Sequence, residues 1–188
     1  MKKNISLFVM ILSSWIITGC VQVTPEYKQN NNQLAISSVR DLPVSYPQDS
    51  LFLLSPKYVK ETSLKAEQTQ AIYHIYSKAI VNDLTKNGYI NGRKGQQPAF
   101  YVGFGIALAD DFSDKKISEK FGVTPGLPEK LDLKKGSFLV YIEDGVTGQR
   151  VWRGIAQGFA KAELTPEQRQ QRAAKIVANV MKQFYQTN

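Results

Sequence analysis

The feature that most limits how this chain can fold is the strict alternation of side chains at residues 99–108. Large apolar side chains occupy every second position, and these are Phe100, Val102, Phe104, Ile106 and Leu108. Smaller side chains or Tyr101 fill the positions between them. A period of two sends alternate residues to opposite faces of a β-strand. The chain is therefore expected to form a sheet with one apolar face that a second layer must cover.

Three further segments are expected to be strands. Phe138–Ile142 and Val151–Ala162 are apolar runs, and the turn formers Asp144-Gly145 and Thr147-Gly148 lie between them. This spacing predicts a β-hairpin. A short apolar run at Leu51–Leu54, closed by Pro56, predicts an edge strand.

Two segments have the three- and four-residue repeat of amphipathic helices, at about 65–87 and 166–185. Gly88 is well placed to end the first helix. Thr165, followed three residues later by Gln168, is a capping-box start for the second. The predicted order is strand, helix, three strands, helix. This pattern favours an α+β fold in which two amphipathic helices pack on one face of an antiparallel sheet of about four strands.

Two strands also carry stripes of small residues. The stripes are Gly103 and Gly105 on one strand, and Gly154, Ala156 and Gly158 on another. If both lie on one side of the sheet, a helix can pack very closely there, which is the favoured interpretation. Alternatively the stripes form the floor of a shallow apolar groove with Tyr101 and Trp152 at its rim. Residues 109–136 interrupt the strands, and a connection this long is either functional or partly mobile.

The N-terminus predicts where the protein goes. Lys2 and Lys3 precede a mostly apolar stretch, Ile5–Ile17, which is shorter than the roughly 18–20 residues that span a bilayer. An aliphatic residue, two small residues and a cysteine follow, and the sequence Ile17-Thr18-Gly19-Cys20 resembles the bacterial lipobox. That resemblance implies cleavage between Gly19 and Cys20 and a diacylglycerol on the Cys20 thiol. We therefore expect a signal peptide at 1–19.

The rest of the chain divides into a tether and a domain. Residues 20–50 are rich in Asn, Gln and Pro and show no sustained period, so a lipidated N-terminus and flexible tether are expected there. Residues 51–188 are expected to form a single α+β periplasmic domain. Val21 follows the cysteine instead of an Asp that would favour inner-membrane retention, which favours the outer membrane, facing the periplasm. Another bacterial envelope membrane surface is the alternative.

Composition excludes several classes of site. The chain has a single Cys and a single His, too few for a multi-Cys metal site, a disulfide framework or a His relay. We expect no cofactor, no metal and no catalytic residues, and hence no enzyme. The formal charge is +8, from 24 Lys and Arg against 16 Asp and Glu. Nucleic acid is not an expected partner in the periplasm, so this excess is interpreted as solubilising charge on the last helix, with attraction to anionic lipid or polymer as the alternative.

Acidic residues offer the remaining catalytic hypothesis. Asp110, Asp111, Glu143 and Asp144 could supply a carboxylate pair for glycoside cleavage, but sequence cannot give their separation. Acids in loops and hairpins usually form turns. A carboxylate-based envelope hydrolase is therefore the least favoured function.

Four features spread over about residues 50–185 carry a family resemblance. They are the Leu51–Leu54 strand, the helix ending in Lys86-Asn87-Gly88-Tyr89, the hairpin leading to Val151-Trp152-Arg153-Gly154, and the amphipathic helix near Phe184. In these the chain is similar to a bacterial lipoprotein family known as domain of unknown function 4136. The resemblance implies an envelope lipoprotein of α+β fold and supplies no catalytic residues.

The function expected from the sequence is therefore a lipid-anchored envelope lipoprotein. It contacts the membrane through the lipid on Cys20, and its non-catalytic domain binds an unidentified envelope protein or polymer. Tyr101, Trp152 and Arg153 are the candidate interface or groove residues, since Trp and Arg often anchor interfaces. Trp152 has plain core as its alternative. The second hypothesis is a small-molecule or lipid carrier that uses the small-residue sheet face.

Overall fold

The computed structural model describes residues 33–55, 63–124, 126–160 and 163–186. Its described elements all belong to one compact unit, Asn31–Asn188. The predicted signal peptide and the lipidated start of the tether lie outside the described residues. In chain order the elements are β1 (Leu34–Arg40), β2 (Leu51–Leu54), α1 (Ala66–Lys86), β3 (Ile90–Asn91), β4 (Phe100–Leu108), α2 (Asp114–Phe121), β5 (Lys135–Asp144), β6 (Arg150–Phe159) and α3 (Pro166–Tyr185).

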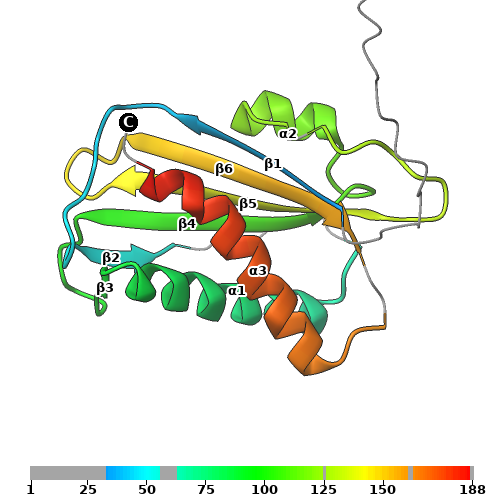
Figure 1. Cartoon of the computed structure of the whole chain (residues 1–188), viewed down its shortest axis with the longest axis horizontal. Coiled ribbons are helices and arrows are strands. Elements are labelled where there is room, and N and C mark those ends of the chain that lie inside the picture. Colours follow the sequence, from blue (N-terminus) through cyan, green and yellow to red (C-terminus); the bar gives the residue numbers. More distant parts are fainter. Residues whose placement is uncertain (1–32, 56–62, 125, 161–162, 187–188) are drawn as a thin grey trace, which may run out of the picture. The chain divides into compact units, whose positions relative to one another are not determined.

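The strands form one mixed sheet in the order β1-β6-β5-β4-β2-β3 (Figure 1). The pairs β1–β6, β6–β5 and β5–β4 are antiparallel, whereas β2 is parallel to both β3 and β4. The predicted α+β class is correct, but the prediction of about four antiparallel strands is wrong. The chain passes through α1 between β2 and β4, and such a crossover returns the chain parallel to the strand that it left. The prediction that β2 is an edge strand is also wrong, because the two-residue strand β3 pairs with its other side and places β2 between β3 and β4.

The structure also corrects the predicted tether. Residues 34–40, which the sequence analysis assigned to a flexible segment, form β1 and pair along their whole length with β6, from Leu34 opposite Gly158 to Arg40 opposite Trp152. The ordered sheet therefore begins well before residue 51.

Local signals set the ends of both long helices. The backbone N–H of Lys65 donates to the Gln68 side chain (3.1 Å), and Gly88, with a φ of +88°, follows the C-cap of α1. At the start of α3, the N–H of Gln168 donates to Thr165 Oγ1 (3.3 Å), and the Thr165 N–H donates to Gln168 Oε1 (3.0 Å). The predicted capping box is therefore confirmed.

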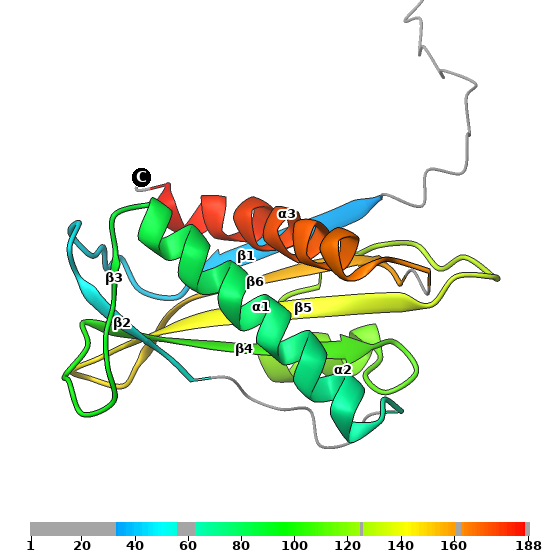
Figure 2. The same cartoon turned by 90° about the horizontal axis from the view of Figure 1, so that it is seen from below.

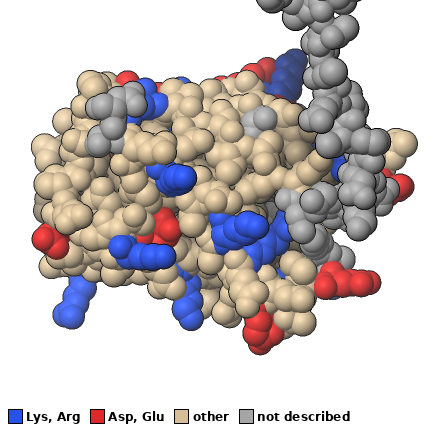
Figure 3. All heavy atoms as spheres, in the orientation of Figure 1, with Lys and Arg blue, Asp and Glu red and all other residues tan. Residues whose placement is uncertain are grey.

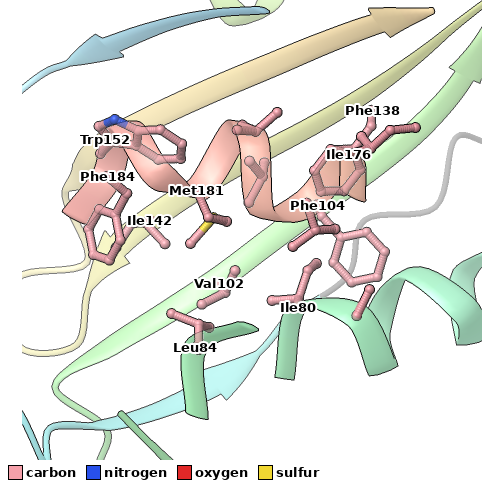
Figure 4. Close-up of a cluster of buried hydrophobic side chains, with 14 of the residues drawn as sticks. Ile80, Leu84, Val102, Phe104, Phe138, Ile142, Trp152, Ile176, Met181 and Phe184 are labelled. Carbon is pink, nitrogen blue, oxygen red and sulfur yellow. The ribbon is translucent and has the colours of Figure 1, made fainter. Parts of the chain in front are cut away.

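Helices α1 and α3 cover the same face of the sheet, as predicted (Figure 2). The main core lies between them and the sheet, and Figure 4 shows it running from Trp152 and Phe184 at one end to Phe104, Phe138 and Ile176 at the other. A third helix, α2, lies on the opposite face, where Ile117 packs with Leu139 and Ile155. This helix falls inside the connection 109–136, for which the sequence predicted no element.

Candidate functional site

The candidate groove residues lie on different faces of the sheet. Directly opposed residues of neighbouring strands share a face, and the register aligns Phe104, Val140 and Gly154 in one row and Gly103, Tyr141 and Arg153 in the next. The Gly154 stripe thus faces α3, and the Gly103 stripe faces the other way. The prediction of one groove with Tyr101 and Trp152 at its rim is wrong, because those two side chains point to opposite sides.

Trp152 is part of the core. Its side chain is 1% exposed, and its ring lies 5.6 Å from that of Phe184, between β6 and α3 (Figure 4). A Cβ built on Gly154 would come within 2.5 Å of the Trp152 ring and 2.7 Å of Val180 Cγ1 in α3. The favoured alternative of close helix packing on a small residue is therefore confirmed at Gly154. A partner has no access to Trp152 in this structure.

Arg153 points to the α2 side and makes structural contacts. Its Nη2 lies 3.1 Å from Asp41 Oδ1, while Arg150 Nε lies 3.1 Å from the other oxygen of the same carboxylate. The Arg153 guanidinium also packs on the Gly122 backbone, where a Cβ would meet it at 3.2 Å. Arg153 therefore joins the first part of β6 to the segment after β1 and to the end of α2.

The acids considered for hydrolysis are distributed among separate structural contacts. Asp110 pairs with Lys134 (2.7 Å), and Asp111 accepts from the Ser63 N–H (2.7 Å). Asp144 accepts from the N–H of Thr147 (2.8 Å) in the β5–β6 turn. Over the described ranges, no group of three His, Cys, Asp or Glu side chains is arranged to hold a metal ion.

The sequence analysis missed a buried polar network on the α2 face. Lys135, 5% exposed, lies 2.6 Å from the carboxylate of Asp114, the first residue of α2. Gln157, 1% exposed, donates to the same carboxylate and to Ser137 Oγ (3.3 Å). Lys135 Nζ also donates to the Leu127 carbonyl (3.3 Å). The network fixes the connection 109–136 to the sheet, and no short motif predicts it because its members are far apart in the sequence.

The α3 side of the sheet contains an apolar cavity of about 160 Å³. Its floor is made of small residues near the ends of β5 and β6, namely Gly136, Ala156 and Gly158. Its walls come from α1, α3 and the neighbouring strands, and they include Ile72, Ile75, Tyr76, Ile106, Phe138 and Ile176. Part of the predicted small-residue stripe therefore does line a hollow, although at a different place and with different rim residues.

Polar groups lie at the rim of this cavity. Arg172 of α3 donates from Nη2 to the Phe159 carbonyl (2.7 Å), which holds its guanidinium over Gly158. The Tyr76 ring stacks on Phe138 at 4.9 Å between centroids. Burial raises the pKa of Tyr76 to about 12, and the nearby Arg172 charge only partly opposes this. The Tyr76 hydroxyl is therefore a neutral donor, beside a permanent cation.

A second groove adjoins the cavity along α3 and shares Leu34, Leu164, Arg172 and Ile176 with it. Gln168, Gln171 and Lys175 also line this groove, and no acid among the described residues lines either hollow. Elsewhere on the face shown in Figure 3 the basic side chains form separate spots. The arrangement can accept an apolar group in the cavity and a negative group beside it.

None of the helices within the described ranges is long and apolar enough to cross a membrane. No curated protein matches the chain. The fold is similar to that of several solved structures. A PDZ domain protein from Parabacteroides distasonis is 14% identical with a TM-score of 0.52, and the match covers 83% of this chain and 36% of that one.

Two other solved structures are similar over most of their own length. A DUF4136 family protein from Bacteroides thetaiotaomicron is 12% identical with a TM-score of 0.49, covering 80% of this chain and 95% of that one. The PelC dodecamer from Paraburkholderia phytofirmans is 10% identical with a TM-score of 0.49, covering 79% and 95%. Identities this low concern the fold alone. The model of the family described as Domain of unknown function (DUF4136) matches residues 47–184, which include every described strand except β1 and every described helix apart from the last residue of α3. The chain therefore belongs to the DUF4136 family.

Proposed function

We propose that this protein is a lipid-anchored envelope lipoprotein whose DUF4136 domain is a non-catalytic module that binds another envelope component. The observation that carries the proposal is the sequence Ile17-Thr18-Gly19-Cys20 directly after an apolar stretch too short to span a bilayer. A thiol is a good nucleophile for thioether formation. Two or more acyl chains anchor a protein stably, because each buried methylene contributes about 0.8 kcal/mol.

The domain is proposed to bind and not to catalyse. Three of the candidate acids, Asp110, Asp111 and Asp144, lie in separate contacts, each with its own structural partner. The basic and apolar hollows beside α3 instead offer a surface that can hold a partner or ligand. Val21, next to the lipidated residue, favours delivery to the outer membrane, with the domain facing the periplasm.

The test is metabolic labelling of the full chain with an alkyne analogue of palmitate in bacterial cells, followed by intact mass measurement. The unchanged chain should be labelled and should begin at Cys20, whereas Cys20→Ala should be neither labelled nor cleaved. Thr18→Ala is the matched control, since it keeps a small residue before the cleavage site and should be processed normally. An unlabelled chain with a free Cys20 thiol would refute the proposal.

The membrane is tested separately by density-gradient fractionation. The unchanged chain should sediment with outer-membrane markers, and Val21→Asp should move it to the inner membrane. If the unchanged chain already sediments with the inner membrane, the proposed destination is wrong although the lipid anchor stands.

A further inference from the structure

The cavity on the α3 side opens to solvent and is lined mainly by aliphatic and aromatic side chains. The α1 side chains Ile72 and Tyr76 face the α3 side chain Ile176 across it, and Gly136 and Gly158 form the floor. An apolar cavity of roughly 150 Å³ stays dry and takes up a molecule the size of benzene, whereas pockets for drug-sized ligands measure roughly 300–1,000 Å³. A volume of about 160 Å³ therefore suits the end of an alkyl chain and not a whole ligand.

The positive charges at the rim of the cavity favour a ligand whose other end is negatively charged. Arg172 uses Nη2 for the Phe159 carbonyl, and a guanidinium has five donors, so others remain for a second acceptor. Lys175, one turn further along α3, is exposed and lines the adjoining groove. No described acid lines either hollow, so neither cation is neutralised there.

The Tyr76 hydroxyl adds a hydrogen-bond donor at the same place. Tyr76 lines the cavity and is half-buried, and its hydroxyl keeps access to water. A carboxylate held by Arg172 can replace the water that accepts from this hydroxyl.

From these contacts we propose that the cavity and the adjoining groove bind a free single-chain anionic amphiphile. The end of its hydrocarbon chain lies between Tyr76, Ile176 and the glycine floor, and its head group lies at Arg172 and Lys175. This deepens the proposed binding function of the domain by naming a ligand class.

A bilayer surface is a different occupant, and the structure disfavours it. The exposed large hydrophobic side chains of the described residues are Ile90, Leu131 and Val146. None of them lines the cavity or the groove. An apolar rim that could enter a membrane is therefore missing from the described part of this site, whereas a single chain needs only the hollow itself.

The test uses the full chain in phosphatidylcholine nanodiscs, with decanoate as the probe and isoleucine methyl groups observed by NMR. The methyl signals of the cavity residues Ile72, Ile106 and Ile176 should shift on titration, while those of Ile117 and Ile155 on the opposite face should not. Decanol, which has the same chain and no charge, should bind about tenfold more weakly, the effect expected for the loss of one charge-assisted hydrogen bond.

Two variants test the two halves of the site. Gly136→Val fills the cavity and should abolish the shifts without unfolding the protein, because a Cβ there meets Leu108 Cδ2 at an ordinary 3.9 Å. Lys175→Gln should weaken decanoate severalfold and leave decanol unchanged. Lys182→Gln, an exposed charge further along the same helix and outside the groove, is the matched control and should leave both unchanged.

Several outcomes would overturn the inference. These are equal affinity for decanoate and decanol, shifts that survive Gly136→Val, or cavity shifts produced by anionic nanodisc lipids without decanoate, which would indicate a bilayer contact. Palmitate labelling at Cys20 does not depend on this cavity, so failure of the ligand inference leaves the lipid-anchor proposal standing, and the reverse holds as well.

Discussion

The contact between α3 and Gly154 predicts a large effect from the smallest possible change, Gly154→Ala. The added methyl would lie 2.5 Å from the Trp152 ring and 2.7 Å from Val180 Cγ1, whereas carbon atoms in contact lie about 3.5–4.0 Å apart. Both neighbours are fully buried, with exposed fractions of 1% and 0%. Each must therefore move by about 1 Å into a space that is already filled.

The magnitude follows from this overlap. Inserting a methyl into a filled core costs about 1–3 kcal/mol, and two rigid neighbours place Gly154→Ala in the upper half of that range, about 2–3 kcal/mol. The matched control is Gly136→Ala in the neighbouring strand, where the new methyl has no neighbour nearer than 3.9 Å. Removing the freedom of glycine from the unfolded chain should stabilise that variant by about 0.4–1 kcal/mol. The two Gly→Ala changes should thus have opposite signs.

The assay is thermal and urea unfolding followed by circular dichroism. For a chain of this size, Gly154→Ala should lower Tm by about 4–12 °C, and Gly136→Ala should raise it by about 1–4 °C. Val180→Ala removes the clashing methyl, so the double variant Gly154→Ala/Val180→Ala should lose less stability than the sum of the two single variants. Equal stability of the two Gly→Ala variants, or strict additivity of the double variant, would refute the close approach of α3 to β6.

The buried network beneath α2 gives two more predictions. Asp114→Asn removes the carboxylate that lies 2.6 Å from the buried Lys135 cation. The free energy of unfolding measured in urea should fall by about 2 kcal/mol, which is less than for a fully buried pair because Asp114 is about a third exposed. The matched control is Asp110→Asn, which breaks an exposed ion pair of similar length and should lower the free energy of unfolding by less than about 1 kcal/mol. If both variants lose the same amount of stability, the buried network has no special role. Burial alone would raise the pKa of Asp114, but hydrogen bonds from Lys135 and Gln157 outweigh it and lower the pKa below the usual 3.8. The ionised Asp114 should therefore stabilise the folded protein fully at pH values above the ordinary carboxyl pKa, and this stabilisation should be lost as the pH falls through the lowered pKa of the folded state. The acid unfolding curve of Asp114→Asn should not show this loss.

The elements that the sequence predicts well are those whose signals are local. Thr165 and Gln168 set the start of α3 through a four-residue motif. The alternation around Phe104 predicts β4, because the size and polarity of each side chain indicate which face of the sheet it occupies. The same alternation does not indicate strand direction, since parallel and antiparallel strands have the same period. The parallel pairing of β2 with β4 depends on the path of the chain through α1, which no short window contains.

The elements that the sequence misses have weak apolar patterns for physical reasons. β1 is an edge strand in which every residue is half-buried, so Ser37 and Ser38 are tolerated where a central strand would carry apolar residues. Helix α2 has only eight residues and buries only Ile117, so it is too short for the apolar repeat that marks α1 and α3. Lys135 begins β5 and would be taken for a solvated residue, because its partner Asp114 comes from a helix on the far side of a long connection.

The candidate ligand site depends on a tertiary angle that the sequence does not contain. Helix α3 crosses the strands diagonally: its C-terminal half lies over β6, and its N-terminal half diverges from β6 toward α1 (Figure 1). Where the two are close, Val180 packs on Gly154, and where they separate, Gly158 becomes the floor of the cavity. One stripe of small residues on β6 therefore serves both alternatives that the sequence left open, close packing at one end and a hollow at the other. Both ends of the stripe lie under the same helix, so a variant that changes the close contact, such as Val180→Ala, should shift α3 and also change the affinity of the cavity for decanoate. Unchanged decanoate affinity in Val180→Ala would mean that the two ends of the stripe are independent.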